Sequence, residues 1–130
     1  MRSSRVEREL ADVSAKYPGS QAVEEAAGSL VLVIPQFPIP AGFNLAAVRI
    51  AVRVPALYPT EKLDLFWLDP DLQRSGAGLP NVMGSGIQMV GQTWTQVSWH
   101  DNAPHDPNRI TILGYIRGIR SWFARQVGVA

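Results

Sequence analysis

Cysteine is absent from this sequence of 130 residues, and histidine occurs only twice, as His100 and His105. Without thiols the chain has no disulfide, no thiolate metal site and no cysteine nucleophile. Two imidazoles are also too few for a zinc site. We therefore expect neither a structural metal nor a bound cofactor.

A charge excess of either sign is also missing. Twelve Lys and Arg residues stand against eleven Asp and Glu residues, which gives a formal net charge of +1. Proteins that hold the phosphate backbone of nucleic acids normally carry a clear basic excess. Nucleic acid is therefore not an expected partner.

Long hydrophobic runs are lacking too. The longest apolar stretch, Ser29 to Ile34, is far shorter than the roughly 20 residues that cross a bilayer. Met1 to Leu10 is charged and does not resemble a secretory signal. We expect a cytoplasmic protein without a membrane partner.

The composition that remains suits one folded domain. Apolar residues make up 46% of the chain and charged residues 18%, a balance typical of globular proteins. No internal repeat or low-complexity linker divides the sequence. Residues 1–130 are therefore expected to form a single domain around one core.

Two segments have the periodicity of amphipathic helices. Arg2 to Tyr17 is the first, and Pro18-Gly19 is its stop signal. In the second, Asp106 is the expected N-cap and Pro107 the expected first helical residue. The apolar stripes of the two helices are Val6, Leu10, Val13 and Tyr17, and Ile112, Ile116, Ile119 and Phe123.

The region between the helices predicts four strands, because β-branched and apolar residues gather there between turn signals. The expected strands are Ala22 to Glu24, Leu30 to Ile34, Ala47 to Val54 and Leu63 to Leu68. Asp71 to Gly91 is rich in glycine without periodicity and is predicted to be a long loop. The predicted fold is α+β: an N-terminal helix, a four-stranded antiparallel meander, a long loop and a C-terminal helix.

Several motifs within this order resemble the ubiquitin-conjugating superfamily. Pro55-Ala56-Leu57-Tyr58-Pro59 resembles the proline and tyrosine-proline turn of that superfamily, and Leu63 to Pro70 resembles the strand that leads into its functional loop. Phe37 to Asn44 and Thr93 to His100 resemble, more narrowly, a divergent bacterial group called prokaryotic family E. The resemblance implies a UBC-like fold that packs Tyr58-Pro59 as a structural turn.

The same resemblance implies two partners, a ubiquitin-activating-like enzyme and a ubiquitin-like modifier whose C-terminus is handed to this protein. Two departures bear on that role. The usual acceptor cysteine is absent, and Asp69-Pro70-Asp71 stands where the superfamily has His-Pro-Asn. Three hypotheses stay open: a conjugating-enzyme-like protein that uses a hydroxyl or whose native cysteine was replaced, a non-catalytic module that binds the modifier or the activating enzyme, and an unrelated α+β scaffold or chaperone subunit.

A hydroxyl acceptor needs a serine or threonine near a base. Ser98 lies two residues before His100, so in an extended chain both side chains project to the same side. Thr93 and Thr95 are alternative acceptors, and comparison with the superfamily favours the stretch from Gly91 to Thr93. Ser98, Thr93 and His100 are therefore the catalytic candidates, although His100 has a second possible role in orienting the loop by hydrogen bonds.

Five further residues are candidates for partner binding. Arg2, Arg5 and Arg8 lie where the resembling enzymes contact their activating enzyme. Trp94 and Trp99 are candidates for recognising the modifier tail, with core packing as the alternative. We expect the tail to lie in a groove between Gly91 to His100 and the loop from Asp71 to Gly91.

The apolar stripe of the second helix yields a direct test. Replacing Ile116 with aspartate should unfold the domain, because burial of an unpaired carboxylate is costly. Thermal unfolding followed by circular dichroism measures the effect. A soluble variant with an unchanged melting temperature would show that the core has been misplaced.

Overall fold

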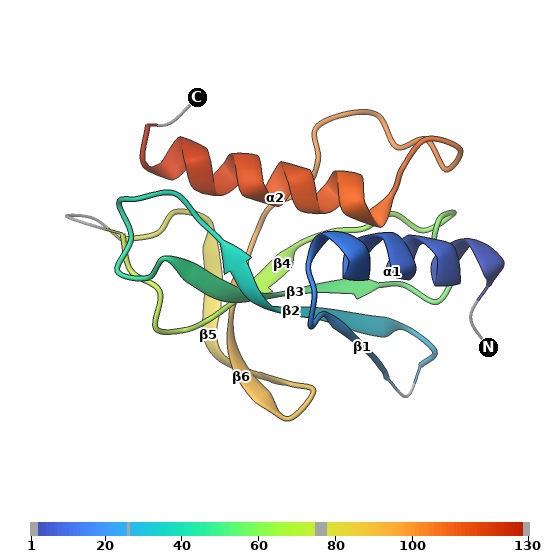
Figure 1. Ribbon diagram of the computed structural model, residues 1–130, viewed down its shortest axis with the longest axis horizontal. Coiled ribbons are helices and arrows are strands. Elements are labelled where there is room, and N and C mark those ends of the chain that lie inside the picture. The colour runs from blue at the N-terminus through green and yellow to red at the C-terminus, as the bar shows by residue number, and fades with distance from the viewer. Residues whose placement is uncertain (1–2, 26, 75–77, 129–130) are drawn as a thin grey trace.

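A computed structural model describes residues 3–25, 27–74 and 78–128 (Figure 1). Within these residues the chain forms two helices and six strands. They are α1 (Ser4–Lys16), β1 (Gln21–Glu24), β2 (Leu30–Pro38), β3 (Ala47–Val54), β4 (Phe66–Leu68), β5 (Val82–Met89), β6 (Gln92–Val97) and α2 (Ile112–Gln126). Neither helix is long and apolar enough to cross a membrane.

The six strands form one antiparallel sheet in the order β1-β2-β3-β4-β6-β5. Figure 1 shows both helices on the same side of this sheet. The α+β class and the meander of the first four strands are confirmed. The final hairpin folds back so that β6 pairs with β4, which leaves β5 at the edge.

The predictions of four strands and of a long loop from Asp71 to Gly91 are wrong, because Val82–Met89 within that segment forms strand β5 and Gln92–Val97 after it forms β6. The pairing of β5 with β6 is interrupted by two register shifts. These shifts remove the alternation of apolar and polar residues by which a strand is recognised in a sequence. Val90 and Gly91 both have positive φ, 48° and 74°, and they make the tight turn between β5 and β6.

The fourth strand is shorter than predicted and begins at Phe66 rather than Leu63. Leu65 has a φ of 62°, a left-handed conformation that interrupts extended backbone. Its amide donates to the carbonyl of Trp99 at 2.8 Å and to Oδ1 of Asp64 at 3.0 Å. One neighbouring acceptor and one acceptor from the segment after β6 therefore hold the irregular start of this strand.

Helix α1 agrees with its prediction. Ser3 is the N-cap, and its side chain accepts a hydrogen bond from the amide of Val6 at 3.1 Å. The helix ends at Lys16, before the Pro18-Gly19 stop. Of the predicted stripe, Val6, Leu10 and Val13 are buried and Tyr17 is half-buried.

Helix α2 begins five residues later than the Pro107 start that the sequence suggests. Thr111 is the N-cap, and its Oγ1 accepts from the amide of Gly114 at 2.9 Å. Asp106 instead closes a turn, in which its carbonyl accepts from the amides of Arg109 and Ile110. The predicted stripe is confirmed, since Ile112, Ile116, Ile119 and Phe123 are all 0% exposed.

The sheet buries apolar side chains on both faces. Between helices and sheet, aromatic rings interlock, for example Phe66 against Trp122 with ring centroids 5.3 Å apart. The other face carries a second cluster of Val31, Val33, Ala51, Trp67, Met89 and Trp94. Two arginines cover its tryptophans: the Arg49 guanidinium lies 4.5 Å from the ring centroid of Trp94, and that of Arg53 lies 5.0 Å from that of Trp67.

One buried carboxylate joins three parts of the fold. Glu9 of α1 is 5% exposed, and its Oε1 accepts from the Tyr58 hydroxyl at 2.8 Å and from the Ile112 amide at 2.7 Å. Its Oε2 accepts from Arg5 Nε at 2.8 Å. The same guanidinium donates to the carbonyls of Pro107 and Ile110, both at 2.5 Å. Arg5 thus occupies carbonyls that a longer α2 would use, which explains the late helix start.

Replacing Glu9 with alanine should destabilise the fold by about 3 kcal/mol, because the Tyr58 hydroxyl, the Ile112 amide and Arg5 all lose their acceptor. Urea unfolding at neutral pH measures this change. Asp12→Ala, at an exposed position of the same helix, should change stability by less than about 0.5 kcal/mol. Equal effects of the two substitutions would contradict a central role for Glu9.

Candidate active-site groove

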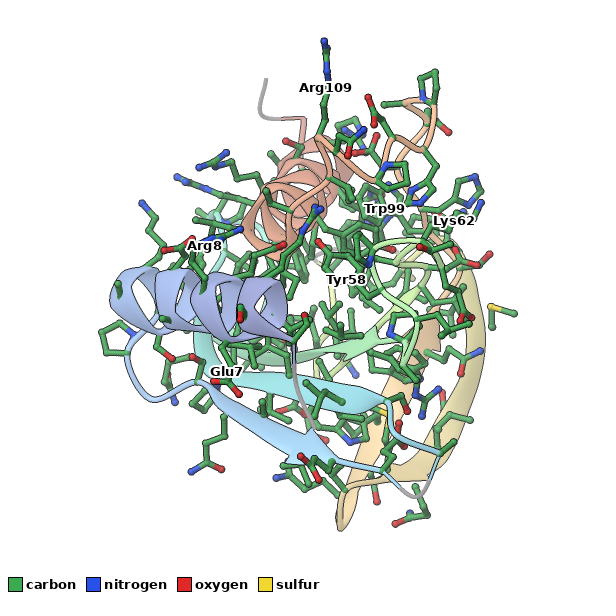
Figure 2. All side chains as sticks on the ribbon, turned by 90° about the vertical axis from the view of Figure 1, so that its right-hand side faces the viewer. Glu7, Arg8, Tyr58, Lys62, Trp99 and Arg109 are labelled. Carbon is green, nitrogen blue, oxygen red and sulfur yellow. The ribbon has the colours of Figure 1, made fainter. Side chains whose placement is uncertain are left out.

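A cavity of about 590 Å³ lies beside the start of α2. Its walls come from residues 62–63, from the segment 100–111 and from the first turns of the helix. Leu63, Ile110 and Tyr115 supply apolar surface, and charged side chains surround them. We refer to this cavity as the α2 groove. Figure 2 labels Lys62 and Arg109 among its lining residues, with Arg109 projecting away from the protein body.

The charges around the α2 groove are mixed. Lys62, Arg109 and Arg117 are cationic, whereas Asp101 and Asp106 are anionic. Arg109 Nε lies 3.6 Å from an Asp106 oxygen, an exposed pair that contributes little to stability. Among the described residues, no group of three or more histidines and carboxylates gathers to hold a metal ion.

His100 lies at the rim of this groove. Its Nδ1 is 3.9 Å from Oδ1 of Asp64, with the two side chains 57% and 50% exposed. At that distance the carboxylate attracts a protonated imidazole without accepting a direct hydrogen bond from it. Sequence reasoning missed Asp64, because residues 64 and 100 come together through tertiary contacts: the pairing of β4 with β6 and the hydrogen bond from the Leu65 amide to the Trp99 carbonyl.

The second histidine has a definite contact. The Nε2 of His105 lies 2.9 Å from the carbonyl of Pro59 and 3.2 Å from that of Thr60. The side chain remains exposed. His105 therefore ties the groove wall to the Tyr58-Pro59 turn when its Nε2 carries a proton.

Ser98 follows directly after β6 and is exposed. Its amide donates to the carbonyl of Asn81 at 2.7 Å, which holds the backbone in place. Within the described residues no hydrogen bond joins its hydroxyl to His100. Catalytic hydrogen bonds often form only when substrate is bound.

Thr93 lies at the other end of β6, beside the hairpin turn. Its Oγ1 accepts from Gln88 Nε2 at 2.8 Å, and its carbonyl accepts from Arg49 Nη2 at 3.1 Å. Five strand residues, roughly 16 Å, separate it from Ser98. The structure therefore does not bring Thr93 to His100, and Thr95 is buried at 6% exposure.

The groove that we expected between Gly91 to His100 and the preceding segment does not form. Strands β5 and β6 are hydrogen-bonded neighbours there, with Ile87 opposite Trp94 and Gln88 opposite Thr93. Paired strands leave no channel between them, because they lie only about 4.8 Å apart.

Both candidate tryptophans pack inside the protein. Trp94 is 0% exposed, and its Nε1 donates to the Met89 carbonyl at 2.9 Å, so it offers no surface to a partner in this conformation. Trp99 is half-buried and lies 5.1 Å from the ring of Tyr115. A side chain on Gly118 would come within 2.5 Å of its ring, so this position requires glycine.

The sequence matches the family described as Prokaryotic E2 family E over residues 7–126, which is most of the chain. The protein belongs to this family. The match supports the UBC-like fold and a role akin to ubiquitin conjugation, which implies a ubiquitin-like modifier and its activating enzyme as partners. Neither the curated proteins nor the solved structures contain a significant match.

In this family E protein, the strand end that would carry His-Pro-Asn has a different chemistry. Asp69 Oδ1 accepts from the Asp71 amide at 2.9 Å, and its Oδ2 lies 3.7 Å from Arg49 Nε. Neither carboxylate offers the N–H donor that stabilises an oxyanion. This strand end therefore does not replace the missing asparagine.

The three N-terminal arginines of the family E chain differ in their surroundings. Arg5 donates to Glu9 and to two carbonyls, and its hydrogen bond to the Glu9 carboxylate raises the pKa of Arg5. Arg8 is exposed on α1 and is labelled in Figure 2. Arg2 lies outside the described residues. Arg8 is therefore the arginine of α1 that remains available to a partner.

Tyr115 joins the two chain segments beside His100. Its hydroxyl donates to the carbonyl of Leu65 at 3.0 Å and to that of Trp99 at 3.3 Å. Burial raises the pKa of Tyr115 above its ordinary value, and the nearby carboxylates of Asp64 and Asp101 raise it further. Tyr115 therefore stays protonated and keeps donating at neutral pH.

Tyr115→Phe should lower stability by about 1 kcal/mol at pH 8. A raised folded-state pKa means that the hydroxyl contributes fully below the ordinary tyrosine pKa of about 10 and loses its contribution as pH rises above it. The difference between wild type and Tyr115→Phe in urea unfolding should therefore shrink at pH 11. A constant difference between pH 8 and pH 11 would contradict this role.

Proposed function

We propose that this protein is the conjugating-enzyme-like component of a bacterial ubiquitin-like modification system, and that the Ser98 hydroxyl receives the modifier's C-terminal acyl group as an oxyester. The observation that carries the proposal is the exposed Ser98 two residues before His100, whose Nδ1 faces the Asp64 carboxylate. In a catalytic triad the hydroxyl is the nucleophile, the imidazole is the base that activates it, and the carboxylate orients and stabilises the imidazole. Membership of the E2-like family supplies the reaction class.

The step proceeds by addition and elimination at the modifier's terminal carbonyl. Ser98 Oγ forms a bond to that carbon, the bond from the carbon to the activating enzyme's sulfur breaks, and the thiol leaves. His100 Nε2 takes the hydroxyl proton as Oγ attacks, and returns a proton to the leaving sulfur. Asp64 stabilises the imidazolium that forms in between, as its position beside Nδ1 allows.

The remaining candidates take supporting or competing roles in this proposal. Thr93 is the competing acceptor, but no imidazole lies near its hydroxyl, which already accepts from Gln88. Arg8 on α1 is the contact for the activating enzyme, because it is exposed and Arg5 is occupied inside the protein. Trp99 acts from beneath the site by packing against Tyr115.

A non-catalytic module that binds the modifier or its activating enzyme is the alternative. Two observations favour it. No hydrogen bond joins Ser98 to His100 among the described residues, and Asp69-Pro70-Asp71 has no side-chain amide donor. This alternative needs no acyl acceptor at all. It predicts complex formation without a covalent product.

Intact mass spectrometry separates the two functions. After incubation with the activating enzyme, ATP and the modifier, wild type should gain the modifier's mass less one water, and the bond should resist thiols and break in alkali. Ser98→Ala should abolish this adduct, and Ser98→Cys should restore it in thiol-sensitive form. Ser121→Ala, at an exposed serine of α2, is the matched control and should leave the yield unchanged.

His100→Ala should slow adduct formation about a hundredfold without altering the fold, because general base catalysis supplies a factor of that order. A quenched time course measures the rate of adduct formation, and circular dichroism checks the fold. An adduct lost in Thr93→Ala but retained in Ser98→Ala would assign the acceptor to Thr93. Absence of any adduct with wild type, together with stable complex formation, would establish the binding module instead.

A further inference from the structure

The free edge of the sheet at β5 is chemically unusual. Strand β5 pairs with β6 on one side and has no strand on the other within the described residues. Figure 2 shows it as the outermost strand on the right. Val82 and Met83 are 41% and 57% exposed, and the strand contains no charged residue and no proline.

Natural edge strands usually carry charges or proline that discourage further pairing. The opposite edge, β1, follows this rule, since it is only four residues long and ends at Glu24. In β5 only the two register shifts discourage the pairing of a further strand. They shorten the regular edge but leave its backbone and apolar side chains accessible.

The size of this edge indicates what kind of partner it can hold. Eight residues span roughly 26 Å, the length of a short peptide segment. A stable dimer normally buries about 800 Å² on each partner, far more than one interrupted strand provides. The edge therefore suits one extended segment better than a second copy of this chain.

The direction of β5 then indicates which end of such a segment lies near Ser98. Val82, the first residue of β5, pairs with Val97, and the preceding Asn81 accepts from the amide of Ser98. A segment added antiparallel to β5 would therefore end beside Val82. Ser98 lies two strand spacings, roughly 10 Å, from the position of the added segment. About three extended residues can cover that distance.

We propose that the C-terminal tail of the ubiquitin-like modifier binds as an added strand along β5, antiparallel to it, and delivers its terminal carbonyl to Ser98. The identity of this occupant rests on the proposed function. The uncharged edge selects an uncharged tail, with an apolar side chain against Val82 and Met83.

The test uses the purified modifier in two forms, one complete and one lacking its whole tail, that is the eight residues that would pair with β5 and the roughly three that would reach Ser98. Binding to this protein is measured by fluorescence anisotropy, and amide hydrogen exchange locates the contact. Val82→Glu should weaken binding of the complete modifier at least tenfold, because a carboxylate on the edge opposes pairing. Val23→Glu, on the opposite edge at 39% exposure, is the matched control and should stay within twofold of wild type.

The complete modifier should slow exchange of the β5 amides, and the truncated form should not. The inference is overturned if β5 exchange is unchanged, if Val82→Glu binds like wild type, or if β5 becomes protected at high protein concentration without modifier, which would indicate a second copy. Adduct formation distinguishes the two proposals. Protection of β5 without an adduct would refute the oxyester alone, whereas an adduct equal in Val82→Glu and wild type would refute the tail site alone.

Discussion

A buried carboxylate in the first helix governs the arrangement of everything around the site. Glu9 has little access to water, so its oxygens must find donors inside the protein. They find them in Arg5, in Tyr58 and in the first amide of α2. This requirement anchors α1, the tyrosine-proline turn and the start of α2 to one another. The α2 groove lies beside the helix start that is fixed in this way.

The two faces of the sheet are covered in different ways. Helices cover one face, and their aromatic residues interlock above it. On the other face Arg49 and Arg53 lie over Trp94 and Trp67, so guanidinium groups take the place of a second layer. Glu25 accepts two hydrogen bonds from Arg53, and these lower its pKa. Arg53 is thereby kept stacked on Trp67.

The candidate site shows where sequence reasoning stopped. Ser98 and His100 were found because adjacent hydroxyl and imidazole groups suggest nucleophile activation at short spacing. Asp64 gave no such signal, since 36 positions separate it from His100 along the chain. The role of Trp94 was ambiguous in the sequence, because a tryptophan can either bind a partner at the surface or pack in the core. Its complete burial shows that it packs in the core.

The sequence by itself determined the elements whose evidence is local: both apolar helix stripes, the first and third strands, the second strand as far as Ile34, the lack of any thiol chemistry and the family resemblance carried by Tyr58-Pro59. It did not show that β2 continues to Pro38. The tertiary structure alone decided the start of α2, the strand β5 and the pairing of His100 with Asp64. These features depend on groups far apart in the chain, such as Arg5 with the Ile110 carbonyl. Local periodicity does not reveal such contacts, because a partner more than a hundred residues away does not change the spacing of apolar residues in either segment.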